Sequence, residues 1–362
     1  MRLEKAVDRR FMGYRSVLGW YHWFKASKRI LTGKTNRSMG DRLWCLRHGF
    51  AVSDLNLFGT EELKKNYRDY LSARDYYKLH PINGEYSFWI DDKLTVKHVF
   101  SRYDAYLPAY YYQLEKDRIM RLADCPADYD ESPEGIAALL REKGVLAAKR
   151  LWGSCGVGFY RLEYRDGQFY VTGKPVSEAE LKEFLSGLYA YLVLEYIVNH
   201  RDIRRIWPEA TNTMRVLMAN CNGKLVRMRA FIRFGSAASN GVDNAAAGGI
   251  ESIIDEDTGR ILFTQSQDTF GMPTRIERHP DSGESFDIQI PRWEQITDKL
   301  EQICRDYPQL RYWGFDVAVT EDSFKILEIN SLSGLMAAQC KEPLIKDPKT
   351  REVFEYFKKT KN

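Results

Sequence analysis

Two apolar runs near the C-terminal end of the chain each surround a carboxylate. Asp316 lies within residues 313–319, and Glu328 lies within residues 324–329 with Asn330 directly after it. Both runs have the composition of β-strands, and the short polar stretch between them predicts a hairpin. A carboxylate among apolar neighbours is costly to bury unless it meets a cation or a hydrogen-bond donor. The chain must therefore fold so that a cation reaches both strands.

Three oxygen ligands can converge on this hairpin. Glu328 and Asn330 stand two residues apart, so both project from the same face of a strand, and Asp316 can face them from the partner strand. Two carboxylates and an amide suit Mg²⁺, which keeps waters and shares its shell with substrate phosphates. The alternative is a structural ion pair with Arg or Lys. We take Asp316, Glu328 and Asn330 as candidate metal ligands.

A second pattern joins a strand-like run, residues 145–149, to a glycine-rich stretch, residues 153–158. Glycines let backbone N–H groups approach phosphate oxygens, and Lys149 adds the positive charge that a triphosphate needs. A glycine-rich hairpin turn beside an exposed lysine is the alternative. The stretch is not a Walker loop, because it lacks Gly-Lys-Ser/Thr. The candidate phosphate ligands are Lys149, Gly153, Ser154, Gly156 and Gly158.

Arginines recur in the strand-like segments between these two patterns. Arg215 follows Asn212 and Thr213, and the alternation of residues 227–233 predicts Arg227, Arg229 and Arg233 on one strand face. A row of guanidinium groups matches phosphate or carboxylate recognition by paired N–H donors. A solvated strand face is the alternative.

The basic N-terminal segment, residues 1–47, carries twelve Lys or Arg against three acidic residues and includes Trp20, Trp23 and Phe24. This pattern suits a helix on an anionic lipid surface or one that holds an acidic substrate. The alternative is an ordinary solvated face with a few buried aromatic residues.

Composition excludes several other classes of protein. No window of about 18 residues is apolar and uncharged, and the basic start lacks the apolar stretch of a signal peptide, so we expect a cytoplasmic protein. The six cysteines form no Cys-x-x-Cys pair, and the six histidines form no pair at metal-ligand spacing. Neither a disulfide framework nor a zinc site is expected.

The overall texture predicts an α+β protein in which helices come first. Residues 1 to about 80 predict helices, whereas residues 86–90 and 110–114 have the composition of short strands. Further along we expect a helix from Glu178 to Tyr191 and another from Trp293 to Tyr307 among strands and turns. Five parts are predicted. They are a helical lobe (residues 1–84), a linking α/β region (85–144) and a small subdomain with the glycine-rich stretch and a hinge (145–200). A large subdomain with the metal and substrate site (201–345) and a tail (346–362) follow.

In this order the motifs resemble those of the ATP-grasp superfamily, and most closely the sugar-transfer-associated ATP-grasp family found with polysaccharide genes. The resemblance spans about residues 91–335. It implies two α+β subdomains that clasp ATP, with the helical lobe at the N-terminus. It further implies that Lys93 supplies the first ATP lysine, with Lys97 as a competitor, and that Lys149 supplies the second. Many ATP-grasp enzymes carry Lys-Pro at the second lysine, whereas this chain has Lys149-Arg150.

The same resemblance assigns the remaining site residues. It implies an adenine-binding hinge strand at Glu195, Tyr196 and Ile197. It implies Mg²⁺, for which Mn²⁺ can substitute, on Asp316, Glu328 and Asn330. The residues that it gives for catalysis are Arg215, Arg229, Arg233 and Asn244.

The function that the resemblance implies is an ATP-dependent carboxylate–amine ligase that forms an acyl phosphate, with a hydroxyl or thiol as a less frequent nucleophile. The substrates implied are an amino acid or a sugar acid of polysaccharide or secondary-metabolite biosynthesis, either of them sugar- or lipid-linked, and no nucleic acid is expected. Two further points stay open. The basic N-terminal segment could contact the inner face of the membrane, and the chain could form a dimer, which is the commonest oligomer. The alternatives are a small-molecule or sugar kinase using the same ATP site, and a non-catalytic nucleotide-binding accessory protein at the membrane surface.

Overall fold

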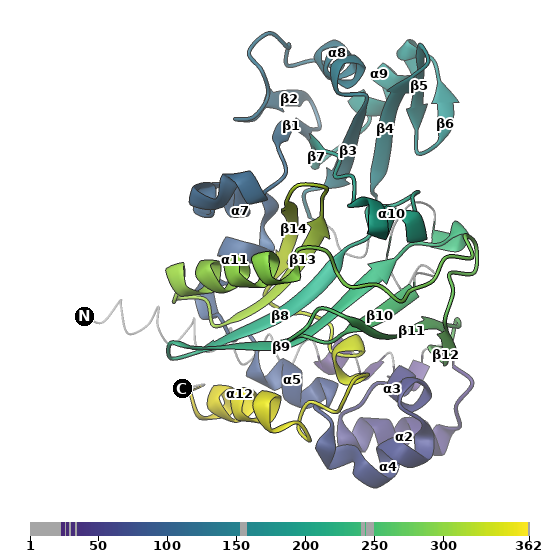
Figure 1. The fold of residues 1–362 in the computed structure, drawn as a ribbon, viewed down its shortest axis with the longest axis vertical. Coiled ribbons are helices and arrows are strands. Elements are labelled where there is room, and N and C mark those ends of the chain that lie inside the picture. Colours follow the sequence, from purple (N-terminus) through teal and green to yellow (C-terminus); the bar gives the residue numbers. More distant parts are fainter. Residues whose placement is uncertain are drawn as a thin grey trace.

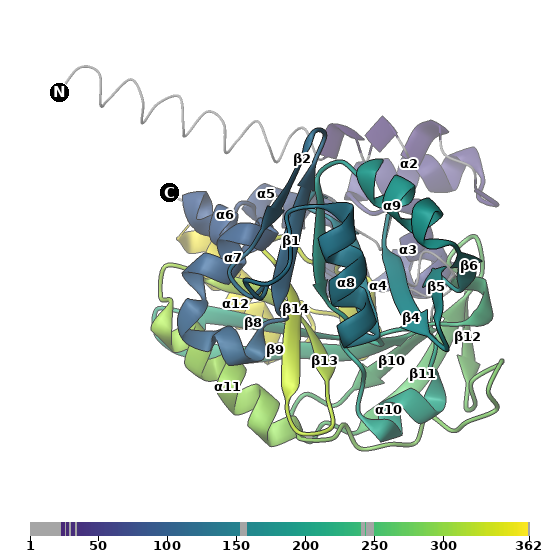
Figure 2. The ribbon, with the colours of Figure 1, turned by 90° about the horizontal axis from the view of Figure 1, so that it is seen from above.

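Two antiparallel sheets of seven strands each form the framework of the computed structural model, which describes residues 23–25, 27–28, 30–32, 35–152, 158–239, 243 and 250–360. Figure 1 shows the first sheet above the second, with the N-terminal helices below the second sheet. Seen from above in Figure 2, strands β13 and β14 of the second sheet run beneath the first sheet.

The first sheet has the strand order β2-β1-β7-β3-β4-β5-β6. Its strands are β1 (Tyr110–Glu115), β2 (Arg118–Arg121), β3 (Val145–Arg150), β4 (Tyr160–Arg165), β5 (Gln168–Val171), β6 (Lys174–Val176) and β7 (Tyr191–Glu195). Helices α8 (Pro133–Lys143) and α9 (Glu178–Ser186) pack against it through a shared core that includes Leu140 and Leu181. Helix α8 begins at the N-cap Ser132, whose side chain accepts from the Gly135 N–H, and α9 begins with a capping box between Ser177 and Glu180.

The second sheet has the strand order β12-β11-β10-β9-β8-β13-β14. Its strands are β8 (Met214–Cys221), β9 (Lys224–Phe234), β10 (Ile250–Ile254), β11 (Ile261–Gln267), β12 (Pro273–Ile276), β13 (Tyr312–Val319) and β14 (Phe324–Asn330). On one face it packs against α11 (Trp293–Asp306), which buries Ile296, Leu300 and Ile303. On the other face, α5 (Ala73–Leu79) and α12 (Pro348–Lys359) cover one end, and the rest carries polar side chains beside a small apolar cluster that includes Phe231 and Ile253.

The N-terminal helices have a core of their own. Helices α2 (Met39–His48), α3 (Val52–Leu57) and α4 (Thr60–Asn66) enclose Cys45, Phe50, Leu55 and Leu63, together with Ile30 and Tyr70. Short helices connect the parts: α6 (Phe88–Asp91), α7 (Lys93–Val99), α10 (Arg201–Ile206) and the 3₁₀ segments η1 (Tyr67–Asp69), η2 (Gly84–Ser87), η3 (Ser101–Tyr106), η4 (Ala237–Ser239) and η6 (Ala337–Gln339). Within the part of the chain that the structure describes, no helix has the length and apolar character needed to cross a bilayer.

Most sequence-based expectations for these elements are confirmed, and two were wrong. The predicted helices before residue 80, the hairpin of β13 and β14 and the helix from Trp293 are present. Residues 86–90 form helical turns rather than a strand, because a short apolar run does not distinguish the two and Ile90 is buried while Phe88 is exposed. The helix from Glu178 ends at Ser186, since Gly187 caps it and Tyr191 already begins β7.

Candidate active site

The register of three strands places the predicted carboxylates side by side. Asp316 of β13 lies opposite Glu328 of β14 on one side and opposite Arg215 of β8 on the other. Asn330 lies opposite Gly314, and its side-chain nitrogen is 3.4 Å from Oδ2 of Asp316. The register therefore brings Asp316, Glu328 and Asn330 together on this hairpin, and their role as metal ligands stays a prediction.

Asp316 is held by two arginines. Arg215 donates from Nε to Oδ1 at 2.5 Å and from Nη2 to Oδ2 at 2.8 Å, and Nη2 of Arg233 donates to Oδ1 at 3.1 Å. Asp316 is only 6% exposed. Burial alone would raise its pKa, but the two guanidinium groups outweigh burial and hold the pKa of Asp316 below its ordinary value. The ion pair that the sequence left as an alternative is thus present here.

Two lysines approach the same hairpin from the first sheet and from α7. Lys149, at the end of β3, donates from Nζ to the carbonyl of Leu327 at 3.1 Å. Nζ of Lys93, at the start of α7, lies 3.5 Å from Oε1 of Glu328. Burial, reinforced by the positive charge of Lys93, lowers the pKa of Lys149 to about 8. Two ammonium groups that repel each other in a partly desolvated place favour the binding of an anion.

The competing lysine, Lys97, lies elsewhere. Its Nζ contacts Asp104 at 2.5 Å and Asp124 at 2.7 Å, and it donates to the carbonyl of Pro108 at 3.3 Å. A lysine between two carboxylates has its charge already balanced. Lys93 is therefore the better candidate for a phosphate ligand.

The arginines of β9 do not share one face as the sequence predicted. A register shift between β8 and β9 at Leu217 and Met218 breaks the alternation, so that Arg227 pairs with Glu301 of α11. Arg229 is 3% exposed in its side chain and contacts Asp347 at 2.6 Å, just before α12. Only Arg233 of these three reaches Asp316. The expectation for Arg227 was wrong because sequence alternation does not reveal a bulge.

Arg229 should matter for stability. Its guanidinium also donates to the carbonyls of Ala338 and Met228, so it ties the segment before α12 to the sheet. Arg229→Ala leaves Asp347 without its partner and should lower the free energy of unfolding by about 3–5 kcal/mol, measured by urea denaturation. Arg260→Ala, which removes an exposed pair with Asp287, should change it by less than about 1 kcal/mol. An equal, small effect of both changes would contradict this role.

Several predicted ligands lie outside the described residues: Gly153, Ser154, Gly156 and Asn244. Gly158 is described and has φ +76°, and a Cβ there would lie 2.6 Å from the hydroxyl of Tyr191. A side chain at this position would be strained and would clash, so glycine is required.

The predicted hinge connects the two sheets. The carboxylate of Glu195 accepts from the backbone N–H of Ala109 at 3.0 Å and lies 3.6 Å from Nζ of Lys325. The carbonyl of Ile197 accepts from the Thr211 hydroxyl at 2.7 Å, and Arg161 lies over the ring of Tyr196. Their predicted contact with adenine stays a prediction.

Two carboxylates near the site were missed from the sequence. Asp91 accepts from the backbone and hydroxyl of Ser331, directly after Asn330, and burial raises its pKa. In the sequence, the position of Asp91 two residues before Lys93 was the feature that could have indicated its place in the site. Glu251 of β10 lies opposite Arg233, and nothing in the sequence links those two positions before the strand register is known.

The donor set fits a nucleotide phosphate well and a divalent cation in part. Among the described residues, no group of three or more His, Cys, Asp or Glu is placed to hold a metal. Glu328, 31% exposed in its side chain, and Asn330 offer oxygens. Both oxygens of Asp316 already accept from arginine, so this carboxylate would have to exchange a guanidinium contact before it could bind a cation.

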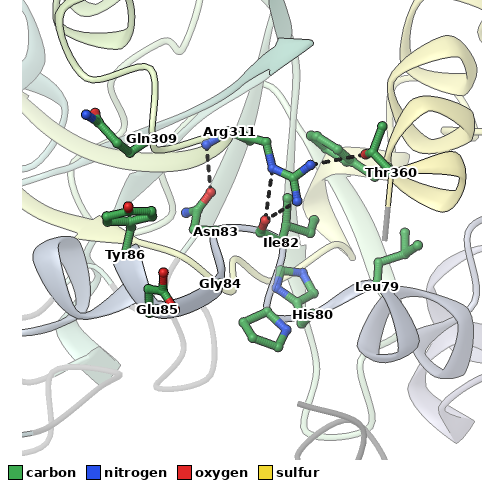
Figure 3. A pocket seen from close by; sticks show the side chains of 12 residues that line it. Leu79, His80, Ile82, Asn83, Gly84, Glu85, Tyr86, Gln309, Arg311 and Thr360 are labelled. Carbon is green, nitrogen blue, oxygen red and sulfur yellow. Dashed lines mark hydrogen bonds between the residues drawn. The ribbon is translucent and has the colours of Figure 1, made fainter. Parts of the chain in front are cut away.

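A hollow of about 220 Å³ lies apart from this site (Figure 3). It is bordered by the segment between α5 and α6 and by Arg311, whose guanidinium donates to the Ile82 carbonyl and the Thr360 hydroxyl. None of the predicted site residues lines it. Because the guanidinium already has protein acceptors, we do not assign a ligand to the hollow.

A family model described as sugar-transfer associated ATP-grasp matches residues 72–349. The match covers more than half of the chain, so the chain belongs to this family and has the ATP-grasp fold, with helices at its N-terminus. No curated protein sequence matches the chain.

Solved structures with a similar fold share little sequence with it. D-alanyl-alanine synthetase A from Vibrio cholerae is 14% identical (77% of this chain, 66% of that chain, TM-score 0.40). A RiPP-associated ATP-grasp ligase from Chryseobacterium gregarium is 13% identical; the match covers 75% of this chain and 59% of that chain, with a TM-score of 0.38. The macrocyclase MdnC from Microcystis aeruginosa is 14% identical; the match covers 76% of this chain and 62% of that chain, with a TM-score of 0.37. The chain spans less than two thirds of each.

Proposed function

We propose that this member of the sugar-transfer associated ATP-grasp family joins a carboxylate to an amine through an acyl phosphate at the expense of ATP. One observation carries the proposal: two lysines, Lys93 and Lys149, and two arginines, Arg215 and Arg233, converge on the β13–β14 hairpin from four different elements. A kinase needs the lysines that bind the phosphates of ATP. Acyl transfer also needs donors for a second anion, the substrate carboxylate.

Lys93 and Lys149 would hold the phosphates of ATP. Phosphoryl transfer requires positioning and neutralisation of charge more than covalent chemistry by the protein. Glu328 and Asn330 would hold Mg²⁺ or Mn²⁺, joined by Asp316 after it exchanges an arginine contact, and the ion would neutralise phosphate charge. We propose Gly158 and the glycine-rich stretch before it as the cover of the phosphates, and the segment from Glu195 to Ile197 as the adenine hinge.

Arg215 and Arg233 would act on the substrate carboxylate. A carboxylate oxygen attacks the γ-phosphorus and ADP leaves; the amine then attacks the acyl carbon, loses a proton, and inorganic phosphate leaves. The oxyanion that forms on the acyl carbon needs fixed donors, and the two guanidinium groups beside Asp316 are the ones within reach. Arg229 is buried against Asp347, and we propose a structural role for it instead.

Hydroxylamine trapping tests this proposal. The chain would be incubated with Mg-ATP and a panel of carboxylic acids, and ADP, phosphate and hydroxamate would be measured. A hydroxamate with one acid supports acyl-phosphate formation and identifies that acid. ADP with a phosphoester and no hydroxamate would instead indicate a kinase.

ATP binding should depend on pH through Lys149. With a pKa of about 8 in the unbound chain, this lysine loses its proton as the pH rises above 8, whereas bound phosphate favours the charged form. We expect ATP binding at pH 8.5 to take up protons, measured by calorimetry in two buffers with different ionisation enthalpies. Lys149→Met should remove the uptake, and no uptake by the unaltered chain would contradict this prediction.

The substrates are proposed at the level of class: an amino acid or a sugar acid, free or sugar- or lipid-linked, with an amine or less often a hydroxyl or thiol as acceptor. We propose a cytoplasmic location, and the predicted division into a helical lobe and two ATP-clasping subdomains is kept as part of the proposal. A dimer is the simplest oligomer to test, by light scattering.

Peripheral contact with an anionic membrane is also proposed for the basic N-terminal segment. Met39 and Leu43, one turn apart on α2, are 61% and 54% exposed, and Arg42 and Arg47 lie on the same helix. Apolar side chains among cations suit an anionic lipid surface. Sedimentation with phosphatidylglycerol vesicles tests the proposal: binding that Met39→Ser with Leu43→Ser weakens would support it, and no binding would refute it.

A further inference from the structure

A band of polar side chains crosses the second sheet beyond the arginines of the candidate site. Arg233 of β9 lies opposite Glu251 of β10, Glu251 lies opposite Gln265 of β11, and Gln265 lies opposite Arg275 of β12. Because opposite residues of paired strands point to the same face, the four side chains share the face that carries Asp316. With strands about 4.8 Å apart, the band extends roughly 14 Å from Arg233 to Arg275.

Glu251 is a buried carboxylate that the charge of Arg233 reaches only from beyond ion-pair distance. Its natural partner, Arg233, is turned toward Thr213 and Asp316. In the described part of the chain no Lys, Arg or His lies within ion-pair distance of Glu251, which is 9% exposed and accepts from the carboxamide of Gln267 at 3.1 Å. A buried carboxylate is costly unless a charged donor compensates it, so this position favours an incoming ammonium group.

Arg275 at the far end of the band is exposed and carries the opposite charge. Its guanidinium lies over the ring of Phe263, 3.1 Å from the ring centre, and within the described residues no carboxylate forms an ion pair with it. Phe263 belongs to an apolar row with Phe231 and Ile253, which runs beside the polar band on the same face. An accessible guanidinium that lies over an aromatic ring at this place suits a carboxylate or phosphate group.

The N-terminal helices border the band. Asn56 of α3 donates to the carbonyl of Phe270 at 2.6 Å, and Ser53 contacts Met336. Gln265 contacts Sγ of Cys340, just after η6. The band is therefore a bounded part of the molecule between the sheet, α3 and η6, and it begins where the proposed acyl phosphate would form.

We propose that this band is the acceptor subsite, and that it takes an amine carrying a second, acidic group. Glu251 receives the ammonium, Gln265 and Gln267 bind neighbouring polar groups, and Arg275 pairs with the acid. This assignment rests on the proposed ligase function, since it places the nucleophile beside Arg233. The backbones of Glu251 and Arg275 stand two strands, roughly 10 Å, apart and their side chains span part of that distance, so the acceptor must carry its amine and its acid at opposite ends.

Binding of matched amines tests the subsite without turnover. The full chain with ADP and Mg²⁺ would be titrated by calorimetry with glucosamine 6-phosphate against glucosamine, and with 6-aminohexanoate against hexylamine. We expect the acidic member of at least one pair to bind at least tenfold more tightly than its partner. A preference within the first pair would indicate that the subsite binds a phosphate, and a preference within the second pair would indicate a carboxylate.

Variants assign the binding to the band. Arg275→Ala and Glu251→Gln should each weaken the acidic amine at least tenfold, and Arg278→Ala, which removes an exposed guanidinium in the same region, should not. No preference for either acidic amine, or equal binding by all variants, would overturn the subsite. Hydroxamate formation by the unaltered chain uses a different nucleophile, so its failure would refute the ligase proposal and leave the binding result to stand separately.

Discussion

Glu328→Ala should abolish turnover while the chain stays folded. Glu328 is partly exposed, but its partner Lys93, 3.5 Å away, is buried, so removing Glu328 should lower the free energy of unfolding by about 1–3 kcal/mol, which a folded domain tolerates. It would also remove the most accessible carboxylate of the proposed metal set and a neighbour of both phosphate lysines. We expect a loss on the order of 10³-fold in the rate of ADP release, corresponding to several kcal/mol of lost charge stabilisation.

The matched control lies in the same hairpin. Glu321→Ala removes an exposed carboxylate between β13 and β14 that pairs with Arg201, and it should leave ADP release unchanged. Thermal unfolding of both variants separates a catalytic loss from a folding defect. Wild-type activity of the Glu328→Ala variant would refute the metal assignment.

Lys149→Met should give an inactive protein that is at least as stable as the original. The lysine is desolvated where β3 meets β14, and burial with the charge of Lys93 depresses its pKa to about 8. A folded-state pKa below the ordinary value means that the charged lysine destabilises the fold at neutral pH, and that the penalty fades between about pH 8 and 10.5. Methionine fills similar space without charge, so stability should rise by on the order of 1 kcal/mol.

Loss of the ammonium should weaken ATP binding and slow phosphoryl transfer by on the order of 10²–10³-fold, as removal of a single preorganised donor does in other enzymes. ATP affinity would be measured by calorimetry and stability by urea denaturation at pH 7. Lys174→Met, at an exposed position of β6, is the control and should alter neither. A Lys149→Met variant that is less stable and still binds ATP would contradict the proposed role.

The arginines show where sequence reasoning reached its limit. Arg215 and Arg233 could be proposed as anion ligands because guanidinium groups bind carboxylates and phosphates by paired N–H donors, and both meet Asp316. Arg227 and Arg229 look the same in sequence, yet a single register shift sends Arg227 to α11, and Arg229 lies against the segment before α12. Strand registry is a long-range property, so local alternation could not separate these four residues.

The pair Lys93 and Lys97 shows the same limit on a helix. Lys93 is the first residue of α7 and Lys97 lies in its last turn, and the resemblance favoured Lys93 but left Lys97 as a competitor. Lys97 is occupied because Asp104 and Asp124, the latter beyond β2, come together around it. Lys93 instead reaches Glu328, more than two hundred residues later in the chain.

The sequence by itself determined the class of protein, the hairpin that carries Asp316 and Glu328, and the kind of anion that Lys149 and the arginines suit. The class of protein followed from the order of the motifs and their resemblance to a known family, whereas the hairpin and the anion-binding residues follow from local composition and from the two-residue period of a strand. Only the tertiary structure decided which cations meet at the hairpin and that Asp316 is already paired with arginine. It alone aligned Glu251, Gln265 and Arg275, because their meeting depends on the order and register of three strands separated by turns.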